Sequence, residues 1–204
     1  IEMVHGSAGA TKFGLQKNVG IAAIIGAGHS VEMIDIRAIG TDNQGRFTDL
    51  ADRTIDRCFK LYPWEDMLRE PFAPQLKAGI FIEPVWKSIL SNKGILPLLW
   101  ERHPNHPNLL PAYFADDPRA ADLSVAVSKP LFSREGENIS LIEGGVVVEA
   151  TQGDYATQPR IVQTYAPLFC TDGQHAVLGS WVIGDRAAGL GMREDGGKIT
   201  RNLS

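Results

Sequence analysis

The sequence lacks a long apolar run and an excess of positive charge. Its longest apolar stretch, residues 19–27, is interrupted by glycines and falls short of the ~20 residues that span a bilayer. The formal net charge is -4, which gives no support for a nucleic-acid surface. We therefore expect no membrane and no nucleic-acid partner. Hydrophobic residues make up 44% of the chain, enough for a sizeable core.

Cysteine is scarce: only Cys58 and Cys170 occur, with no CxxC spacing. We expect both to be reduced, buried thiols in a cytoplasmic protein. We expect no signal peptide, and the sequence begins with Ile1 rather than Met. This start favours a portion of a larger protein, a processed chain or an incomplete one.

Several motifs are absent or incomplete. Val31 stands where a dinucleotide fingerprint beginning at Gly26 needs its third glycine, and no GxxxxGK loop occurs. Ser180 lacks the second glycine of a nucleophile elbow. His103 and His106 flank prolines in a loop rather than sharing one helix face, so we expect no metal site there.

The pattern of the chain changes near residue 123. Before it, we expect strands at residues 31–36 and 55–61, and helices at residues 63–70 and 91–101. After it, alternating apolar segments between Gly-containing turns predict strands at residues 123–129, 139–142, 146–150, 160–165, 176–183 and 187–193. This combination predicts an α+β protein, α/β in its first half and mostly antiparallel sheet in its second.

Two basic residues stand near candidate anion sites. Lys129 ends an apolar strand and is followed by a short polar loop, residues 133–138, whose backbone N–H groups can surround a phosphate. The alternative is a strand-end lysine that reaches solvent beside an ordinary hairpin loop. Lys93 precedes an apolar helix, where a cation is unfavourable unless an anion lies nearby. Ser91 or Asn92 can also serve there simply as a helix cap.

Two further segments have both functional and ordinary interpretations. Residues 163–168 leave a strand and can present backbone groups to a planar base, or can be a plain strand end. Arg193 follows a glycine-rich strand, where a guanidinium can contact a phosphoryl group. It can equally form a surface ion pair with Glu194 or Asp195.

Several strings occur in a characteristic order along the chain. They are Phe59-Lys-Leu-Tyr-Pro-Trp-Glu65, Glu83-Pro-Val-Trp-Lys-Ser-Ile-Leu-Ser-Asn-Lys93, Leu96-Pro-Leu-Leu-Trp-Glu101, His106-Pro-Asn-Leu-Leu110, Lys129-Pro-Leu-Phe-Ser-Arg-Glu-Gly136, Gly179-Ser-Trp-Val182, Gly191-Met-Arg-Glu-Asp195 and Ile199-Thr200. In this order they resemble the glutathionylspermidine synthase family, in particular its stand-alone bacterial members of acid–amine ligase type. The resemblance covers about residues 55–204.

This resemblance implies an ATP-grasp fold and an ATP-dependent ligase that joins a small-molecule acid to an amine through an acyl phosphate. It implies a partial substrate-side segment at residues 1–54 and the nucleotide-binding region at residues 55–204. Arg193 would hold the phosphate of the intermediate. The residues implied to bind ATP are Lys93, Lys129, Gly136, Gln163, Thr164, Tyr165, Ala166, Val177, Lys198, Ile199 and Thr200.

The resemblance also implies Mg²⁺, but the family's metal-binding segments lie upstream and do not occur in this sequence. We therefore assign no metal ligand and expect the C-terminal part of a larger enzyme. The alternative function is a catalytically silent nucleotide-binding or scaffold protein that keeps the ATP-grasp fold. The sequence does not identify the acid, the amine or the oligomeric state.

Overall fold

The computed structural model describes residues 2–5, 21, 22, 24–76 and 80–201. The chain divides into two compact units, residues 1–89 and 90–204, and the division falls within α3 (Ser88–Ser91). The expected boundary near residue 54 stays a prediction, and residues 6–20 of that expected segment lie outside the described part. No helix within the described ranges is long and apolar enough to cross a membrane.

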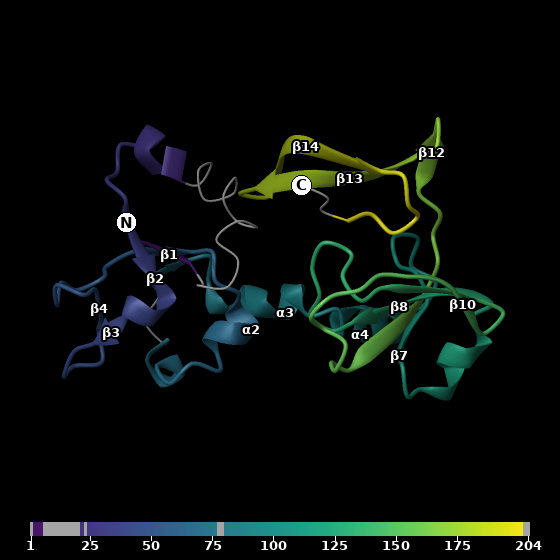
Figure 1. The fold of residues 1–204 in the computed structure, drawn as a ribbon, viewed down its shortest axis with the longest axis horizontal. Coiled ribbons are helices and arrows are strands. Elements are labelled where there is room, and N and C mark those ends of the chain that lie inside the picture. Colours follow the sequence, from purple (N-terminus) through teal and green to yellow (C-terminus); the bar gives the residue numbers. More distant parts are fainter. Residues whose placement is uncertain (1, 6–20, 23, 77–79, 202–204) are drawn as a thin grey trace. The chain divides into compact units, whose positions relative to one another are not determined.

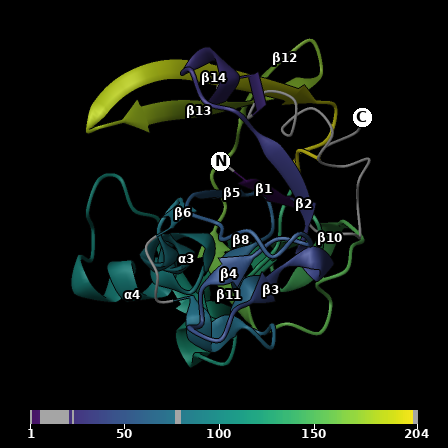
Figure 2. The same cartoon turned by 90° about the vertical axis from the view of Figure 1, so that its left-hand side faces the viewer.

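Unit 1, drawn in Figure 1, is built on a parallel sheet with the strand order β2-β1-β5-β6, and these four strands are labelled in Figure 2. Its strands are β1 (Glu2–His5), β2 (Glu32–Asp35), β5 (Cys58–Lys60) and β6 (Phe81–Ile82). A short antiparallel pair, β3 (Gly40–Thr41) and β4 (Phe47–Thr48), lies between β2 and β5 in sequence. The core of the unit consists of Ile34, Ile36, Phe47, Ile55, Cys58, Trp64, Met67, Leu76 and Phe81.

The helices of the chain are shorter than the sequence pattern predicts. The expected helix at residues 63–70 is only α2 (Trp64–Met67), with Pro63 as its N-cap rather than its first residue. The expected helix at residues 91–101 is two pieces, α3 and α4 (Ile95–Arg102). Gly94 is the N-cap of α4, and the Asn92 side chain accepts a hydrogen bond from its N–H at 2.8 Å.

Unit 2 contains two antiparallel sheets. The larger has the order β10-β9-β8-β11-β7, and the smaller has the order β12-β13-β14. Within this unit the smaller sheet lies over the larger one, as both Figure 1 and Figure 2 show. The strands are β7 (Ala112–Phe114), β8 (Val125–Pro130), β9 (Ser140–Glu143), β10 (Val146–Ala150), β11 (Arg160–Thr164), β12 (Phe169–Thr171), β13 (Gln174–Ile183) and β14 (Arg186–Asp195).

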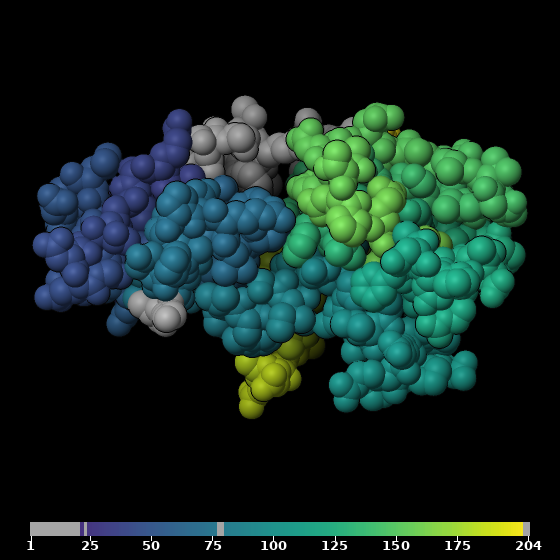
Figure 3. Space-filling model, turned by 90° about the horizontal axis from the view of Figure 1, so that it is seen from below, coloured from purple at the N-terminus to yellow at the C-terminus, as the bar shows by residue number. Residues whose placement is uncertain are grey.

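Turn residues with positive φ join these strands. Gly144 and Gly145 connect β9 to β10 with φ of 56° and 80°, and Gly184 and Asp185 connect β13 to β14 with φ of 54° and 62°. Paired positive φ values are those of two-residue hairpin turns whose twist matches that of the strands. The tip of the β13–β14 hairpin, yellow-green in Figure 3, projects from the rest of unit 2. The α+β class and the antiparallel second half are therefore confirmed.

The environment of the cysteines agrees only in part with expectation. Neither forms a disulfide bond, but Cys58 is buried in the unit 1 core whereas Cys170 is exposed on β12. The prediction of two buried thiols is wrong for Cys170. β12 is a short strand of the smaller sheet whose three residues are all exposed.

Candidate functional site

A pocket of about 280 Å³ lies in unit 2. One wall is a face of the five-stranded sheet. Gln163 on β11 is directly opposite Val127 on β8, and Val127 is directly opposite Leu141 on β9. Directly opposed residues of antiparallel strands share one face of a sheet. Lys129, two residues beyond Val127, extends the same face, and all four side chains line the pocket.

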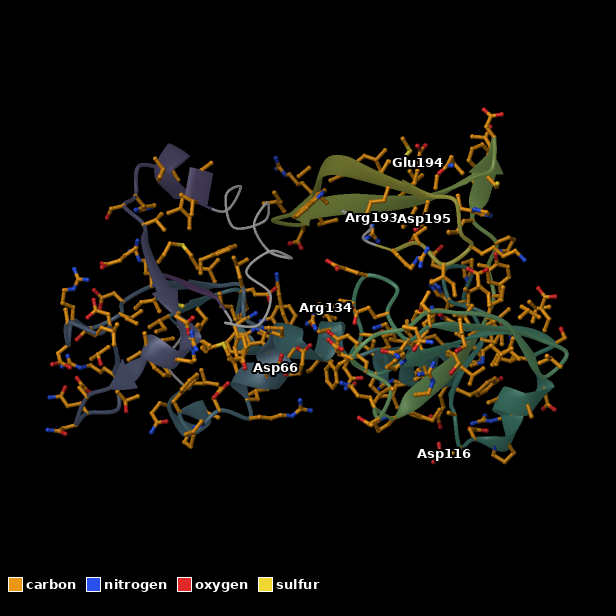
Figure 4. The ribbon with its side chains drawn as sticks, in the orientation of Figure 1. Asp66, Asp116, Arg134, Arg193, Glu194 and Asp195 are labelled. Atoms are coloured by element: carbon orange, nitrogen blue, oxygen red, sulfur yellow. The ribbon has the colours of Figure 1, made fainter. Side chains whose placement is uncertain are left out.

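The smaller sheet forms the facing wall. Val177 on β13 is directly opposite Arg193 on β14, and both line the pocket. Figure 4 shows the Arg193 side chain pointing from β14 toward the five-stranded sheet, whereas Glu194 points the other way. Arg193 therefore faces the same pocket as Lys129. Two residues after Arg193, both carboxylate oxygens of Asp195 accept hydrogen bonds from backbone N–H groups, those of Gly197 and Arg201.

Lys129 does not reach outward as an ordinary strand-end lysine. Its Nζ donates a hydrogen bond to Oε1 of Gln163 at 2.8 Å. Gln163 is buried and Lys129 is partly buried. This burial lowers the pKa of Lys129 below its ordinary value, because the charged ammonium loses hydration. A ligand with negative charge at this position would replace the lost hydration of the ammonium.

The loop at residues 133–138 closes one side of the pocket through Gly136, which has a φ of 76°. The loop is fixed at its end. The Thr151 hydroxyl donates to the Gly136 carbonyl, and Asn138 Oδ1 accepts from the Tyr155 N–H at 2.8 Å. Arg160 donates to the Asn138 carbonyl at 2.7 Å and to the Ser128 hydroxyl at 2.8 Å. The loop is thus joined to β8 and to the segment after β10.

Two backbone segments complete the lining of the pocket. One is residues 164–166, which begins at the last residue of β11, and the other is residues 198–200, after β14. The N–H groups of Thr164 and Tyr165 donate to the carbonyls of Pro111 and Val125 at 2.8 and 3.0 Å. These bonds fix the course of the first segment where the chain leaves the sheet. The pocket therefore has a defined backbone edge as well as charged side chains.

The structure thus brings together all but one of the predicted site residues. Lys129, Gly136, Gln163, Thr164, Tyr165, Ala166, Val177, Arg193, Lys198, Ile199 and Thr200 line the pocket. Lys93 is not one of the lining residues. Its Nζ donates to the Ser133 carbonyl at 2.7 Å, and its N–H donates to the Leu131 carbonyl at 2.9 Å. Lys93 therefore lies at the start of the 133–138 loop, and its role as a phosphate ligand stays a prediction.

Sequence reasoning missed the apolar residues of the pocket. These are Leu110, Val127, Ile139, Leu141 and Leu168. Alternation along β8 was a usable signal for Val127, since it shares a face with Lys129. The position of Leu141 in the pocket can be predicted only if β9 is known to pair with β8, and the alternation pattern does not specify that pairing. Such apolar walls favour a ligand with a flat or hydrophobic part next to its charged part.

Among the described ranges, no group of three or more His, Cys, Asp or Glu side chains is arranged to hold a metal ion. The pocket cations Lys129, Arg193 and Lys198 supply positive charge instead. This arrangement suits an anion, and we assign no chemical step to a metal.

The fold and the site define an α+β protein with a cation-lined pocket between two antiparallel sheets. The chain belongs to the glutathionylspermidine synthase family: the family model described as "Glutathionylspermidine synthase preATP-grasp" matches residues 21–204. The resemblance seen in the sequence is thereby confirmed.

Similar proteins carry ligase and synthetase names. A Haemophilus influenzae protein named "Putative acid--amine ligase" is 41% identical over 187 residues, covering 87% of this chain and 48% of that protein. Trypanothione synthetase of Crithidia fasciculata is 30% identical over 186 residues, covering 78% and 28%. The Escherichia coli bifunctional glutathionylspermidine synthetase/amidase is 29% identical over 192 residues, covering 81% and 31%. The chain thus spans about half the length of the first protein and less than a third of the other two.

Proposed function

We propose that this chain forms the ATP-binding part of an ATP-dependent carboxylate–amine ligase with an ATP-grasp fold. The observation that carries the proposal is the pocket of unit 2, where Lys129, Arg193 and Lys198 meet a backbone edge and a glycine-containing loop. Among the described residues, the pocket lining contains these three cations and no acidic residue, although the chain as a whole has a net charge of -4. Lys198 also lies 3.9 Å from Glu143, which is outside the lining. Family membership and the names of the relatives support the same function.

Within the pocket, adenine would lie against residues 164–166 and the apolar wall of Val127, Leu141 and Val177. The Thr164 and Tyr165 N–H groups already bond to protein carbonyls. Base recognition would therefore use the Ala166 N–H and the carbonyl oxygens of the segment. Lys129 and Lys198 would contact the phosphates, with Gly136 closing over them. Phosphate oxygens accept hydrogen bonds from backbone N–H groups and from ammonium groups.

This placement of charge supports the reaction that the family resemblance implies. The substrate carboxylate attacks the γ-phosphorus of ATP, the bond from that phosphorus to the ADP oxygen breaks, and an acyl phosphate forms. The amine then attacks the acyl carbon and loses a proton, and inorganic phosphate leaves to give the amide. Arg193 would hold the transferring phosphoryl group, whose negative charge resists the approach of a carboxylate. Closure by the 133–138 loop would keep water from the acyl phosphate.

Several parts of the proposal concern the complete enzyme. Small-molecule acid and amine substrates, a requirement for Mg²⁺ and a cytoplasmic location are predictions for the whole protein. The relatives' names give glutathionylspermidine and trypanothione as products of those proteins. For this chain we propose only the reaction class, because the described residues do not distinguish one acid or amine from another.

The test is amine-dependent release of ADP by the complete enzyme with candidate acids and amines. We expect Arg193→Ala to abolish this release while ATP binding is retained. A matched control is Arg186→Ala, at the far end of the same strand and outside the pocket lining. A protein that binds ATP but releases no ADP with any acid and amine would instead be a silent nucleotide-binding or scaffold protein.

A further inference from the structure

Asp195, the last residue of β14, is a buried carboxylate that does not line the pocket. Its Oδ1 accepts a hydrogen bond from the Gly197 N–H at 2.8 Å. Its Oδ2 accepts one from the Arg201 N–H, also at 2.8 Å. One side chain therefore bonds to backbone groups two and six residues further along the chain. These bonds bend residues 196–201 into a turn.

The turn presents its central residues to the pocket. Lys198, Ile199 and Thr200 all line it, and Ile199 is buried. The Thr200 carbonyl lies so close to Gly136 that a Cβ built on this glycine would be 2.4 Å from the oxygen. The turn and the 133–138 loop thus meet without room for a side chain. Together they form the closing edge of the pocket.

Asp195 is also linked to the residues proposed to act on phosphate. It lies two residues after Arg193, on the same face of β14. Its cross-strand partner is His175 on β13, and this pair is two rows away from the Val177–Arg193 pair. Fixing the end of β14 therefore fixes the strand that carries Arg193 and the turn that carries Lys198.

We propose that Asp195 is a positioning residue for nucleotide binding, holding residues 198–200 against the pocket and against Gly136. It acts through two backbone hydrogen bonds and without touching the nucleotide. The inference rests on the proposed function, because it assumes that the pocket binds ATP. The same two hydrogen bonds, with the Gly197 bond foremost, hold the pKa of Asp195 below its ordinary value. The carboxylate is therefore charged, and a charged acceptor makes stronger hydrogen bonds than a neutral one.

The experiment compares Asp195→Ala and Asp195→Asn with the wild-type chain. Three quantities are measured: amide hydrogen exchange of Gly197 and Arg201 by NMR, the rate of tryptic cleavage after Lys198, and the dissociation constant for ATP. Asp185→Asn is the matched control. Asp185 is an exposed acid in the turn of the same hairpin, with a φ of 62° that asparagine tolerates.

For Asp195→Ala we expect at least tenfold faster exchange of both amides, faster cleavage and at least tenfold weaker ATP binding. Asp195→Asn should fall between alanine and wild type, because its amide oxygen still accepts one of the two N–H groups. Asp185→Asn should match wild type in all three. If Asp195→Ala fails to fold, the comparison of Asp195→Asn with wild type in the same three measurements tests the positioning role.

The possible results distinguish failure of the Asp195 positioning role from failure of ATP binding in the pocket. If folded Asp195 variants bind ATP as tightly as wild type, or exchange the two amides no faster, the positioning role is overturned. If the wild-type chain itself binds no ATP, the proposed function fails. Amide exchange and tryptic cleavage then still decide separately whether Asp195 holds the turn.

Discussion

The ammonium of Lys129 donates a 2.8 Å hydrogen bond to the side-chain carbonyl of Gln163, linking β8 to β11 on the pocket face. The two residues are not directly opposed, since Lys129 is paired with Ile161 and Gln163 with Val127. The long lysine side chain therefore reaches along the sheet, over the wall of the pocket. A lysine held in this way is oriented before any ligand arrives.

Replacing Lys129 by methionine removes the charge and keeps much of the volume. We expect ATP binding to weaken at least tenfold, equivalent to about 1.4 kcal/mol. The fold should be retained, because burial of the ammonium is itself unfavourable. Isothermal titration of the chain with ATP measures the effect. Lys87→Met, in unit 1, is the control, and equal affinities in the two variants would exclude Lys129 from the site.

The lowered pKa of Lys129 predicts how stability and binding depend on pH. Between the lowered pKa and the ordinary value of 10.5, the unfolded chain holds more protons at this residue than the folded chain. The free energy of unfolding of unit 2 should therefore gain a contribution that increases with pH across this window. ATP affinity should decrease over the same window, as the ammonium loses its proton.

Urea unfolding and ATP titrations at several alkaline pH values, with wild type and Lys129→Met, measure both effects. Lys129→Met should lack both the pH-dependent contribution to the free energy of unfolding and the decrease in ATP affinity. Gln163→Glu should move the decrease in affinity to higher pH, because a carboxylate beside the ammonium favours its charged form. Identical pH profiles for all three proteins would show that Lys129 does not titrate as described.

Gly136 and Gly145 allow conformational strain to be separated from loss of space. Their φ values are similar, 76° and 80°, so alanine at either position costs about 1–2 kcal/mol through backbone strain. Only at Gly136 would the new Cβ meet the Thr200 carbonyl, at 2.4 Å, whereas nothing lies within 4 Å at Gly145. Gly136→Ala should therefore weaken ATP binding much more than Gly145→Ala. Equal effects on ATP affinity would contradict the close contact between the loop and the turn.

Arg160 fixes the end of the 133–138 loop. Its guanidinium donates to the Ser128 hydroxyl at 2.8 Å, and to the carbonyls of Ser128 at 3.1 Å and Asn138 at 2.7 Å. Arg160→Leu should lower the free energy of unfolding of unit 2 by about 1.5–3 kcal/mol, as expected for hydrogen bonds to a charged group. Chemical denaturation measures this. Arg119→Leu, which breaks an exposed pair with Asp117, should have the smaller effect, and the reverse order would contradict the role of Arg160.

The sequence predicted the hairpin strands of unit 2 well, because alternation and glycine turns are local signals. β10 has its expected bounds, residues 146–150, and β11 differs by one residue at its end. β7 and β12 were missed because each has three residues, too few to show a pattern. β1 was missed because its place is set by pairing with β2 and β5, distant in sequence. The helix expected at residues 91–101 is interrupted where the Lys93 N–H bonds to Leu131.

For the site, the family resemblance selected residues that sequence patterns alone left ambiguous. Residues 163–168 had been equally compatible with a plain strand end. The structure adds what local patterns do not contain: the apolar wall that includes Leu141, the hydrogen bond between Lys129 and Gln163, and the turn made by Asp195. Each depends on which strands pair, or on a backbone amide several residues away.

The central claim, that ATP binds in the pocket of unit 2, is tested most directly by photolabelling the chain with 8-azido-ATP. Tryptic digestion and mass spectrometry then locate the label. We predict label on the peptide spanning residues 161–186, which contains residues 163–166 and Val177, suppressed by excess ATP and strongly reduced in Lys129→Met. ATP-protected label found only in residues 1–89, or label on the 161–186 peptide that excess ATP leaves unchanged, would contradict the account.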